Sequence, residues 1–380
     1  MKKIFQVVIL FGFVSMGQFL LSNTPWNLVN SLDNPKEILN DKPRYGEIKL
    51  DLREEILIKE SEDRPQYMFR RIWDLAVDSN GFVYVLDDER IIKFDNQGNY
   101  KATIGKKGQG PGEFMQPHKL FLDQKGNLYV NDQGASILEY SQEGAFKKLV
   151  RLGFSIPAFP VELRNFYVDE QGYIYAFHRE YSESGIHKNL LKVDTQGQIL
   201  KKIADFPEMS VKLTPRKGGG IVGGIIHSYS SSCFFCPVGN SFLCFGGNMD
   251  YKLFLVDLAG NIRVVFSKHE RAHPISSEEK KILGESKEVR LPPHRPFFKG
   301  LLSDEKGRIY VIRTKSLLDK SQIEDIDIFS RDGIYLYRTS LKYTPQVIKD
   351  GYIYVVSKDE RELREIKKLK IKNYHNIKEN

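Results

Sequence analysis

Cysteine and histidine are scarce in this chain of 380 residues, which contains three cysteines and eight histidines. So few cysteines exclude a small fold held together by several disulfides. Cys233 and Cys236 have the spacing of zinc ligands, but no second pair of cysteines or histidines follows at the interval of a zinc finger. We therefore interpret the pair as buried strand residues and expect no metal and no cofactor.

Long apolar runs are missing beyond the N-terminus. Two lysines precede the apolar run Ile4 to Val14, and small residues follow up to Gly17. This pattern predicts a secretory signal over residues 1–21, with cleavage after Gly17, or alternatively an uncleaved anchor extending to Leu21. Either form predicts a protein outside the cytoplasm: periplasmic, in the cell envelope or secreted. Membrane contact is expected only through this segment.

Charge of one sign is not concentrated anywhere. The formal net charge is +8, but the basic residues are dispersed along the chain. The densest group, between Arg361 and Lys372, alternates with glutamates in the manner of a solvated outer strand. In an exported protein this pattern argues against a nucleic-acid partner.

The chain does have one repeated pattern, a glycine followed three residues later by an aromatic residue. Its six copies are Gly81 and Tyr84, Gly126 and Tyr129, Gly172 and Tyr175, Gly239 and Phe242, Gly307 and Tyr310, and Gly351 and Tyr354. Successive glycines are 45, 46, 67, 68 and 44 residues apart. This spacing is typical of propeller blades with two insertions and not of helical solenoids.

Each copy lies within a unit that reads as four strands. An apolar segment leads to an Asp three residues before the glycine in four copies, and the turn at the glycine reverses the chain into the aromatic strand. A third strand, a second glycine turn and a fourth strand follow. The sixth unit lacks its fourth strand, and Ile48 to Ile58 is a spare strand ahead of the first. Pairing the two would remove two exposed edges.

We therefore predict an all-β protein, a six-bladed β-propeller with four antiparallel strands per blade, whose ring is closed by an N-terminal strand added to the last blade. The predicted organisation is an extended segment over 22–47, the propeller over 48–373 and a polar tail over 374–380. We expect a monomer.

A glycine-rich stretch runs from Gly105 to Phe114 and is followed by Pro117. Phosphate-binding loops of this kind need a helix directly after them, whereas a strand is expected here. With this stretch and the segment from Leu120 to Asp132, the chain resembles the NHL-repeat family of six-bladed β-propellers. The resemblance extends over about 73–356 and is weakest in the fourth unit, where Cys236 replaces the Asp. It implies the fold but not the function, because the family includes protein-binding, carbohydrate- or RNA-binding and lyase members.

Equivalent offsets from the repeat should form rings of side chains at one mouth of the channel. Five positions before the Asp position stand Trp73, His118, Arg164, Ser231, Lys299 and Tyr343. Six positions after the glycine stand Asp87, Asp132, His178, Phe245, Arg313 and Ser357. The candidate binding residues are His118, Arg164, His178, Lys299, Arg313, Tyr343, Asp87 and Asp132. Clustered cations among them favour an anionic ligand. The alternative is a solvated channel mouth whose charged side chains pair with one another and bind no ligand.

Two insertions, over 207–230 and 269–298, connect a fourth strand to the next first strand, so both should lie over this mouth, where long loops often carry binding function. The alternative is that the two insertions have no function of their own. Ser276 to Ser286 is a helix candidate within the second insertion. Cys233 and Cys244 fall on neighbouring predicted strands, and the sequence does not decide whether they form a disulfide.

These patterns predict an exported binding or scaffold module that recognises an anionic ligand, such as an acidic sugar or peptide, or a partner protein at the channel mouth. The alternative is a metal-assisted lyase or hydrolase in the same channel, in which His118, Asp132 and His178 hold an ion. No triad or metal-helix motif supports that alternative, so catalysis is the less favoured interpretation.

Overall fold

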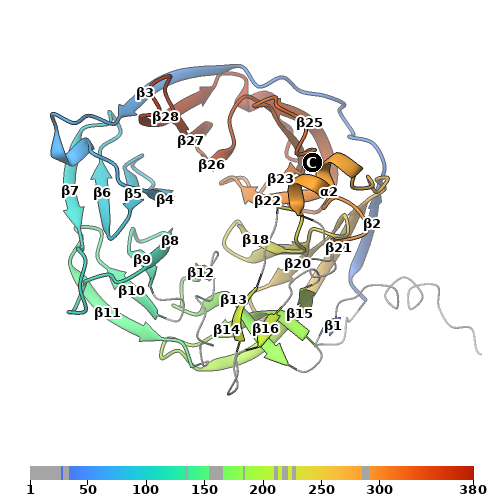
Figure 1. Ribbon diagram of the computed structural model, residues 1–380, viewed down its shortest axis with the longest axis horizontal. Helices are drawn as coiled ribbons and strands as arrows, with labels where there is room; N and C mark the ends of the chain where they lie inside the picture. The colour runs from blue at the N-terminus through green and yellow to red at the C-terminus, as the bar shows by residue number, and fades with distance from the viewer. Residues whose placement is uncertain are drawn as a thin grey trace, which may run out of the picture.

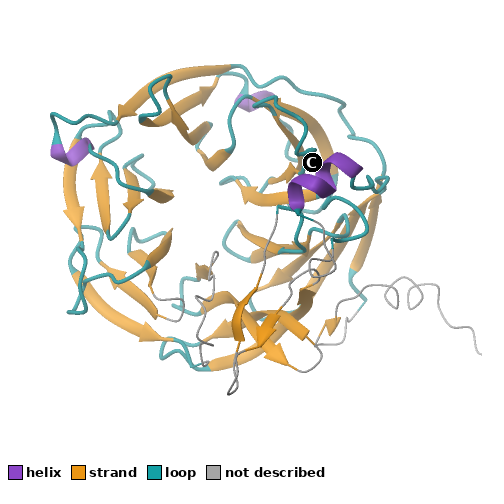
Figure 2. Ribbon diagram, viewed as in Figure 1, coloured by secondary structure: helices purple, strands orange, loops and turns teal. Residues whose placement is uncertain are grey.

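The structure is a computed structural model that describes residues 27–28, 34–132, 136–153, 166–182, 185–208, 213–215, 221–224, 228–284 and 291–380. The predicted signal or anchor over 1–21 lies outside the described residues. Six antiparallel sheets stand around a central axis (Figure 1), and nearly all the regular structure is strand (Figure 2). The predicted six-bladed β-propeller is confirmed.

The blades follow one another along the chain, and their strands run from the inside of the ring outward. Blade one contains β4 (Ile72–Val77), β5 (Val83–Asp87), β6 (Arg90–Phe94) and β7 (Tyr100–Ile104), and blade two β8 (Pro117–Leu122), β9 (Leu128–Asp132), β10 (Ser136–Tyr140) and β11 (Phe146–Arg151). Blade three contains β12 (Phe166–Val168), β13 (Ile174–Ser182), β14 (Gly185–Val193) and β15 (Ile199–Glu208), and blade four β18 (Cys233–Val238), β19 (Phe242–Gly247), β20 (Lys252–Asp257) and β21 (Ile262–Lys268). Blade five contains β22 (Phe298–Ser303), β23 (Ile309–Arg313), β24 (Glu324–Phe329) and β25 (Tyr335–Leu341), and blade six β26 (Pro345–Lys349), β27 (Tyr352–Lys358), β28 (Arg364–Ile371) and β3 (Leu52–Lys59).

The smaller elements lie between or beside the blades. They are β1 (Asn27–Leu28), β2 (Lys36–Asn40), the hairpin β16 (Leu213–Pro215) and β17 (Ile221–Gly224), the helix α2 (Ser277–Leu283), and the 3-10 turns Pro65–Tyr67 and Tyr374–Asn376. The helix lies within the segment where the sequence predicts one. Ser276 caps it, and Gly284 ends it in the left-handed conformation, with φ at 70°.

Blade six takes its outer strand from the beginning of the chain. β3 pairs antiparallel with β28, from Leu52 opposite Ile371 to Lys59 opposite Glu365. The pairing confirms the predicted ring closure. It joins the two ends of the propeller by main-chain hydrogen bonds and leaves neither blade six nor blade one at an open end.

The segment ahead of β3 is built into the ring as well. β1 pairs with β15 of blade three, β2 adds a parallel fifth strand to β21 of blade four, and Glu47 bridges Arg338 of blade five. The buried Asn40 side chain donates to the carbonyls of Ser267 and Gly333 and so ties blade four to blade five. In Figure 1 this blue segment follows the outer edge of the ring from β2 to β3. The sequence predicts only an extended segment here.

Hydrophobic side chains form six clusters among the described residues, one between each pair of neighbouring blades. The repeat tyrosines belong to these clusters, as Tyr84, Tyr175 and Tyr310 are at most 1% exposed. Each of the three hydroxyls donates to the Asp at the start of its own turn, with oxygen–oxygen distances of 3.3 Å to Asp78, 3.2 Å to Asp169 and 2.9 Å to Asp304. The repeated pattern therefore joins turn and core in one unit.

The end of the chain packs against blade five. Ile377 is 2% exposed, and its carbonyl accepts a hydrogen bond from Arg308, which is fully buried. Arg308 also pairs with Asp304, and the Tyr374 hydroxyl donates to the same carboxylate at 3.2 Å. The predicted polar tail thus contributes an apolar anchor and a hydrogen bond to the propeller.

The three cysteines are free and buried. Cys244 lies opposite Cys236 in the pairing of β18 with β19, whereas Cys233 lies opposite Gly247. The disulfide considered between Cys233 and Cys244 is not present, because the register of this hairpin places Cys236, and not Cys233, opposite Cys244.

We predict that Tyr310→Ala lowers the free energy of unfolding by about 3–5 kcal/mol, because it removes a fully buried aromatic side chain between blades five and six. Tyr310→Phe should cost only about 1 kcal/mol, since Asp304 keeps its other partners. Chemical denaturation measures both, with Tyr100→Ala on the outer strand β7 as the matched control. A cost for Tyr310→Ala within about 0.5 kcal/mol, as for an exposed site, would contradict the register.

Candidate functional site

One face of the ring carries the starts of the inner strands and the turns between second and third strands, and we call it the mouth face. In blades one, two, five and six the inner strand has a β-bulge near its start. The bulged residues are Trp73, His118, Lys299 and Gln346. A bulge leaves one residue out of the pairing and re-aims its side chain. We call these four residues the mouth arc, because their blades follow one another around the ring.

Trp73 is the most accessible aromatic group of the mouth arc. Its side chain is 40% exposed although it lies on an inner strand. The His118 ring meets it edge-on, with centroids 5.2 Å apart, and the Arg71 guanidinium lies 5.0 Å from its ring centroid. Blades one and two therefore present an indole flanked by an imidazole and a cation.

Asp87 fixes the chain that leads to Trp73. Its Oδ1 accepts from the main-chain nitrogens of Arg70 and Arg71, at 2.7 and 2.8 Å, and Arg90 pairs with its other oxygen. The nitrogen of Asp88 donates to the carbonyl of Arg71. Asp87 is fully buried, so its carboxylate positions the start of β4 and does not face the channel.

Asp132 holds the chain at the start of the inner strand of blade two, as Asp87 does in blade one. Its carboxylate accepts from the nitrogens of Met115, at 3.1 Å, and Gln116, at 2.6 Å. The glycine-rich stretch before them is held by its own hydrogen bonds and by Phe114, which is completely buried. A strand, β8, follows this stretch, as the sequence predicts. The contacts of the glycine-rich stretch therefore indicate a structural role: the stretch leads the chain to the start of β8 at the mouth face.

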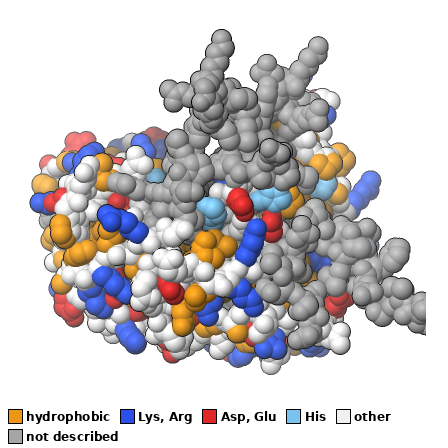
Figure 3. Space-filling model, turned by 90° about the horizontal axis from the view of Figure 1, so that it is seen from below, with side chains coloured by type: hydrophobic (Ala, Val, Ile, Leu, Met, Phe, Trp, Pro, Cys, Tyr) orange, Lys and Arg blue, Asp and Glu red, His pale blue; other side chains and the backbone are white. Residues whose placement is uncertain are grey.

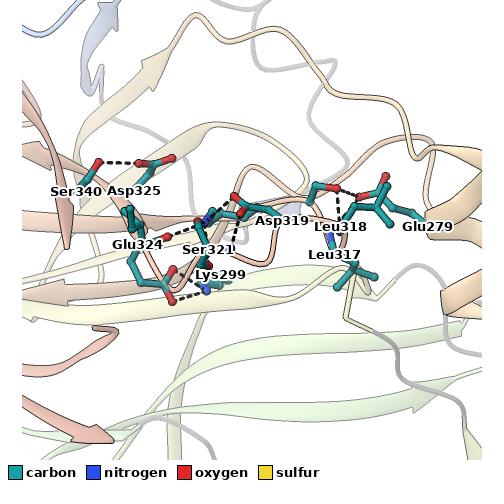
Figure 4. Close-up of polar contacts among 12 residues, drawn as sticks. Glu279, Lys299, Leu317, Leu318, Asp319, Ser321, Glu324, Asp325 and Ser340 are labelled. Carbon is teal, nitrogen blue, oxygen red and sulfur yellow. Dashed lines mark hydrogen bonds and ion pairs between the residues drawn. The ribbon is translucent and has the colours of Figure 1, made fainter. Parts of the chain in front are cut away.

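Two of the predicted cations are paired with acids. Both Glu324 oxygens lie within 2.9 Å of the Lys299 ammonium, as the close-up shows (Figure 4). Arg313 pairs with Glu270 and lies 3.7 Å from the buried Asp327. Burial alone raises the pKa of Asp327, but the charges of Lys268 and Arg313 outweigh it and lower that pKa. Arg313 is thus part of a network between blades four and five.

The remaining predicted residues lie elsewhere. His178 is half-buried in the middle of β13, where it pairs with Asn189. Arg164 lies outside the described residues. Tyr343 lies two residues before β26. The turn between the first two strands of blade six has two residues, between Lys349 and Tyr352, whereas that of blade one has five, between Val77 and Val83. Counting back from the repeat glycine by the same number of residues therefore goes too far in blade six. The equal-offset rule therefore selects Tyr343 where the bulge selects Gln346.

The offset rule also fails in blade four, where only three residues separate Val238 from Phe242. Phe245 consequently lies in the core and is fully buried. Asn248 takes the part that Asp87 and Asp132 have in their blades, as its Oδ1 accepts from the nitrogen of Ser232. In each of these blades an Asp or Asn at the end of the second strand holds the start of the inner strand. The strand pairing identifies this residue, whereas a fixed offset from the glycine does not.

A groove of 1180 Å³ crosses blade six on the mouth face. Glu324 of blade five and Arg71 of blade one lie at its sides, and it reaches Lys59 on the outer strand. Its basic lining residues are Lys59, Arg71, Lys342, Lys358, Arg361, Arg364 and Lys367, and its acidic ones are Glu324, Asp359, Glu360, Glu362 and Glu365. Five of the seven cations form ion pairs. Arg71 and Lys342 have none with any described residue.

Charge is mixed on one edge of the ring. Figure 3 shows an edge of the ring on which basic, acidic and hydrophobic side chains alternate where the chain is described. Such a surface has no extended field of one sign.

The helix α2 and the loop 314–323 lie together on the mouth face at blade five (Figures 1 and 4). Glu279 joins them, as its Oε1 accepts from the hydroxyls of Tyr229 and Ser316 and from the nitrogen of Leu317. Burial alone raises the pKa of Glu279, but these hydrogen bonds prevail and lower it to about 2. Much of the first insertion, 207–230, lies outside the described residues.

Metal-binding side chains do not gather in the part of the chain that is described: no group of three or more His, Cys, Asp or Glu residues is arranged to hold an ion there. No helix in that part is long and apolar enough to cross a membrane.

A family described as a domain of unknown function, DUF4934, matches residues 62–290. The chain belongs to this family. The match spans the first four blades, and its description assigns no activity. Comparison with curated proteins found no match.

Comparison with solved structures found matches at low sequence identity. One is a protein of Bacteroides fragilis named as an inferred exported protein, with 14% identity, a TM-score of 0.53, and coverage of 89% of this chain and 100% of the other. A DUF4221 family member of Bacteroides vulgatus has 11% identity, a TM-score of 0.48, and coverage of 85% and 98%. A streptogramin B lyase has 12% identity, a TM-score of 0.39, and coverage of 85% and 98%. At 14% identity the likeness to the Bacteroides fragilis protein concerns the fold alone.

We predict that Glu279 stabilises the mouth face at neutral pH and not in acid. Because its folded pKa of about 2 lies below the ordinary 4.5, its contribution is complete above pH 4.5 and is lost as the pH falls towards 2. Glu279→Gln should therefore lower the free energy of unfolding by about 1–3 kcal/mol at pH 7 and by clearly less at pH 3. Denaturation at both pH values measures this, with the exposed neighbour Glu278→Gln as control. An equal loss at both values would contradict it.

Proposed function

We propose that this protein is an exported binding module that recognises an anionic ligand at the mouth of its propeller. The mouth arc and the adjoining groove form the binding surface. Asp87 and Asp132 support it from below by holding the starts of two inner strands. The resemblance to NHL repeats, a family with many binding members, agrees with a binding function.

The observation that carries the proposal is a pair of cations without ion pairs, each beside an aromatic ring: Arg71 beside the exposed Trp73, and Lys342 beside the half-buried Tyr343. Arg71 and Lys342 line one groove, and neither forms an ion pair with a described residue. Every other basic residue of the groove is paired with a carboxylate. Unpaired cations in a concave surface attract anions, and an anion would complete the charge balance.

Export is supported by two independent features. The N-terminus has two lysines followed by an apolar run, as in secretory signals. The similar propeller of Bacteroides fragilis is named as an inferred exported protein. An extracytoplasmic module would meet anionic sugars, peptides and the acidic segments of other envelope proteins.

The metal-assisted lyase or hydrolase gains no observation in its favour. His118 packs against Trp73, Asp132 binds main-chain amides, and His178 lies in another strand of another blade. Among the described residues these three side chains form no ligand set. We therefore do not propose catalysis.

Charge removal tests the proposal. The double variant Arg71→Gln with Lys342→Gln should weaken binding of hexagalacturonate or hexaglutamate at least about tenfold and reduce the salt dependence of binding. Titration calorimetry at two salt concentrations measures both, with maltohexaose as the neutral probe. The matched control, Lys101→Gln with Arg331→Gln, removes two exposed cations that do not line the groove.

Three outcomes would contradict the proposal. If neither anionic probe binds the unaltered protein at millimolar concentration, the anionic ligand is wrong. If a probe binds and the double variant binds it equally well, the placement at this groove is wrong. Binding of a protein partner that both variants retain would place recognition on another surface.

A further inference from the structure

We propose that the ligand of this groove is a chain of uronic acid residues, and that Trp73 and Tyr343 are two platforms on which its sugar rings stack. This inference rests on the proposed anionic site and names its ligand class. It follows from a repetition on the mouth face. Arg71, which lines the groove, lies over the exposed ring of Trp73 in the adjoining mouth arc, and Lys342 lies over the half-buried ring of Tyr343 in the groove itself.

The first platform is Trp73. Its bulge takes it out of the pairing of β4 with β5, and 40% of its surface is open to solvent. Arg71 lies over the ring at 5.0 Å, and His118 supports the indole edge-on. The Asp87 carboxylate holds the nitrogen of Arg71 at 2.8 Å. The pair of indole and guanidinium is thus set in place before any ligand arrives.

The second platform is Tyr343. The Lys342 ammonium lies 5.4 Å from its ring centroid, and the Lys367 ammonium lies 5.7 Å from it. Lys367 is neutralised by Glu54 and Glu365, at 3.2 and 3.3 Å, whereas Lys342 has no carboxylate among the described residues. Tyr343 therefore repeats the arrangement of Trp73, one ring with one available cation.

A sugar acid matches this arrangement in both shape and charge. A pyranose ring has an apolar face of C–H bonds, which packs on the electron-rich face of an aromatic ring, and an edge of hydroxyls. A uronic acid adds one carboxylate per ring, which fits one cation per platform. A phosphate-rich ligand carries about two charges per group and would need several cations together, which the groove does not offer.

Hydroxyl partners for a sugar also lie on the mouth face. Gln346 of the mouth arc has an exposed amide, and Thr344 and Glu324 line the groove. The Thr344 hydroxyl already donates to Glu324, so the two form a donor and acceptor pair beside the ammonium of Lys299. Neutral and paired groups of this kind suit vicinal hydroxyls better than they suit a second anion.

The size of the groove favours a chain over a single sugar. Its 1180 Å³ exceeds the roughly 300–1,000 Å³ typical of small-molecule pockets. It runs from Arg71 and Tyr343 near the channel to Lys59 at the rim. An oligomer can occupy both platforms at once, and the second contact then becomes intramolecular and raises the affinity.

The test is a titration of the full mature protein with oligogalacturonates of three and six residues, and with hexamannuronate, hexaglutamate and maltohexaose. Hexagalacturonate or hexamannuronate should bind better than hexaglutamate, and maltohexaose should bind worst. Trp73→Ala and Tyr343→Ala should each weaken uronate binding at least about tenfold and leave hexaglutamate binding within about twofold. Tyr100→Ala, which truncates an exposed aromatic of the outer strand β7, is the matched control.

The outcomes separate this inference from the proposed function. If the aromatic variants bind uronates as the unaltered protein does, while Arg71→Gln with Lys342→Gln does not, the anionic site stands and sugar stacking is overturned. If only hexaglutamate binds, the ligand is an acidic peptide and the sugar class is overturned. If no anionic probe binds, both fail. Thermal melting of each variant confirms that folding is intact, and Trp73→Phe, which keeps a ring, should recover part of the affinity.

Discussion

The pairing of β3 with β28 is the constraint on which the rest of the molecule depends. Blade packing is a chain of local interfaces, each with its own hydrophobic cluster, and only this pairing makes the chain of blades a closed ring. Closure sets the distance between neighbouring inner strands and brings blade six beside blade one. The groove that uses residues of blades five, six and one exists because the two ends of the propeller are joined there.

Bulges connect this scaffold to its surface chemistry. In four consecutive blades the inner strand leaves one residue out of its pairing, and these residues, Trp73, His118, Lys299 and Gln346, stand at the mouth. The acidic residues at the ends of β5 and β9, the second strands of blades one and two, have a complementary role. Asp87 and Asp132 are buried and satisfied by main-chain amides, so they hold the platform and leave contact with a ligand to other groups.

The sequence predicts the fold well because the repeated pattern has a direct physical cause. The glycine turn, the Asp that accepts the turn amides and the tyrosine that donates to that Asp are all local in the chain. The path of the N-terminal segment could not be predicted, because a single residue such as Asn40 stabilises it through contacts more than 200 positions away.

The site was predicted only in part. The offsets and the strand pairing both select His118 and Lys299, because their blades share one turn length. Tyr343 is selected by an offset that the two-residue turn of blade six invalidates, yet it lines the groove. Whether a cation is available depends on partners that no spacing reveals. Lys299 and Arg313 meet Glu324 and Glu270, whereas Arg71 and Lys342, which the offsets did not select, have no ion pair among the described residues.

The most direct test of the account is a crystal structure of the protein with hexagalacturonate. The account predicts sugar rings stacked on Trp73 and on Tyr343, with carboxylates within hydrogen-bond distance of Arg71 and Lys342. An oligosaccharide bound on another face, or along this groove without contact to either aromatic ring, would contradict it.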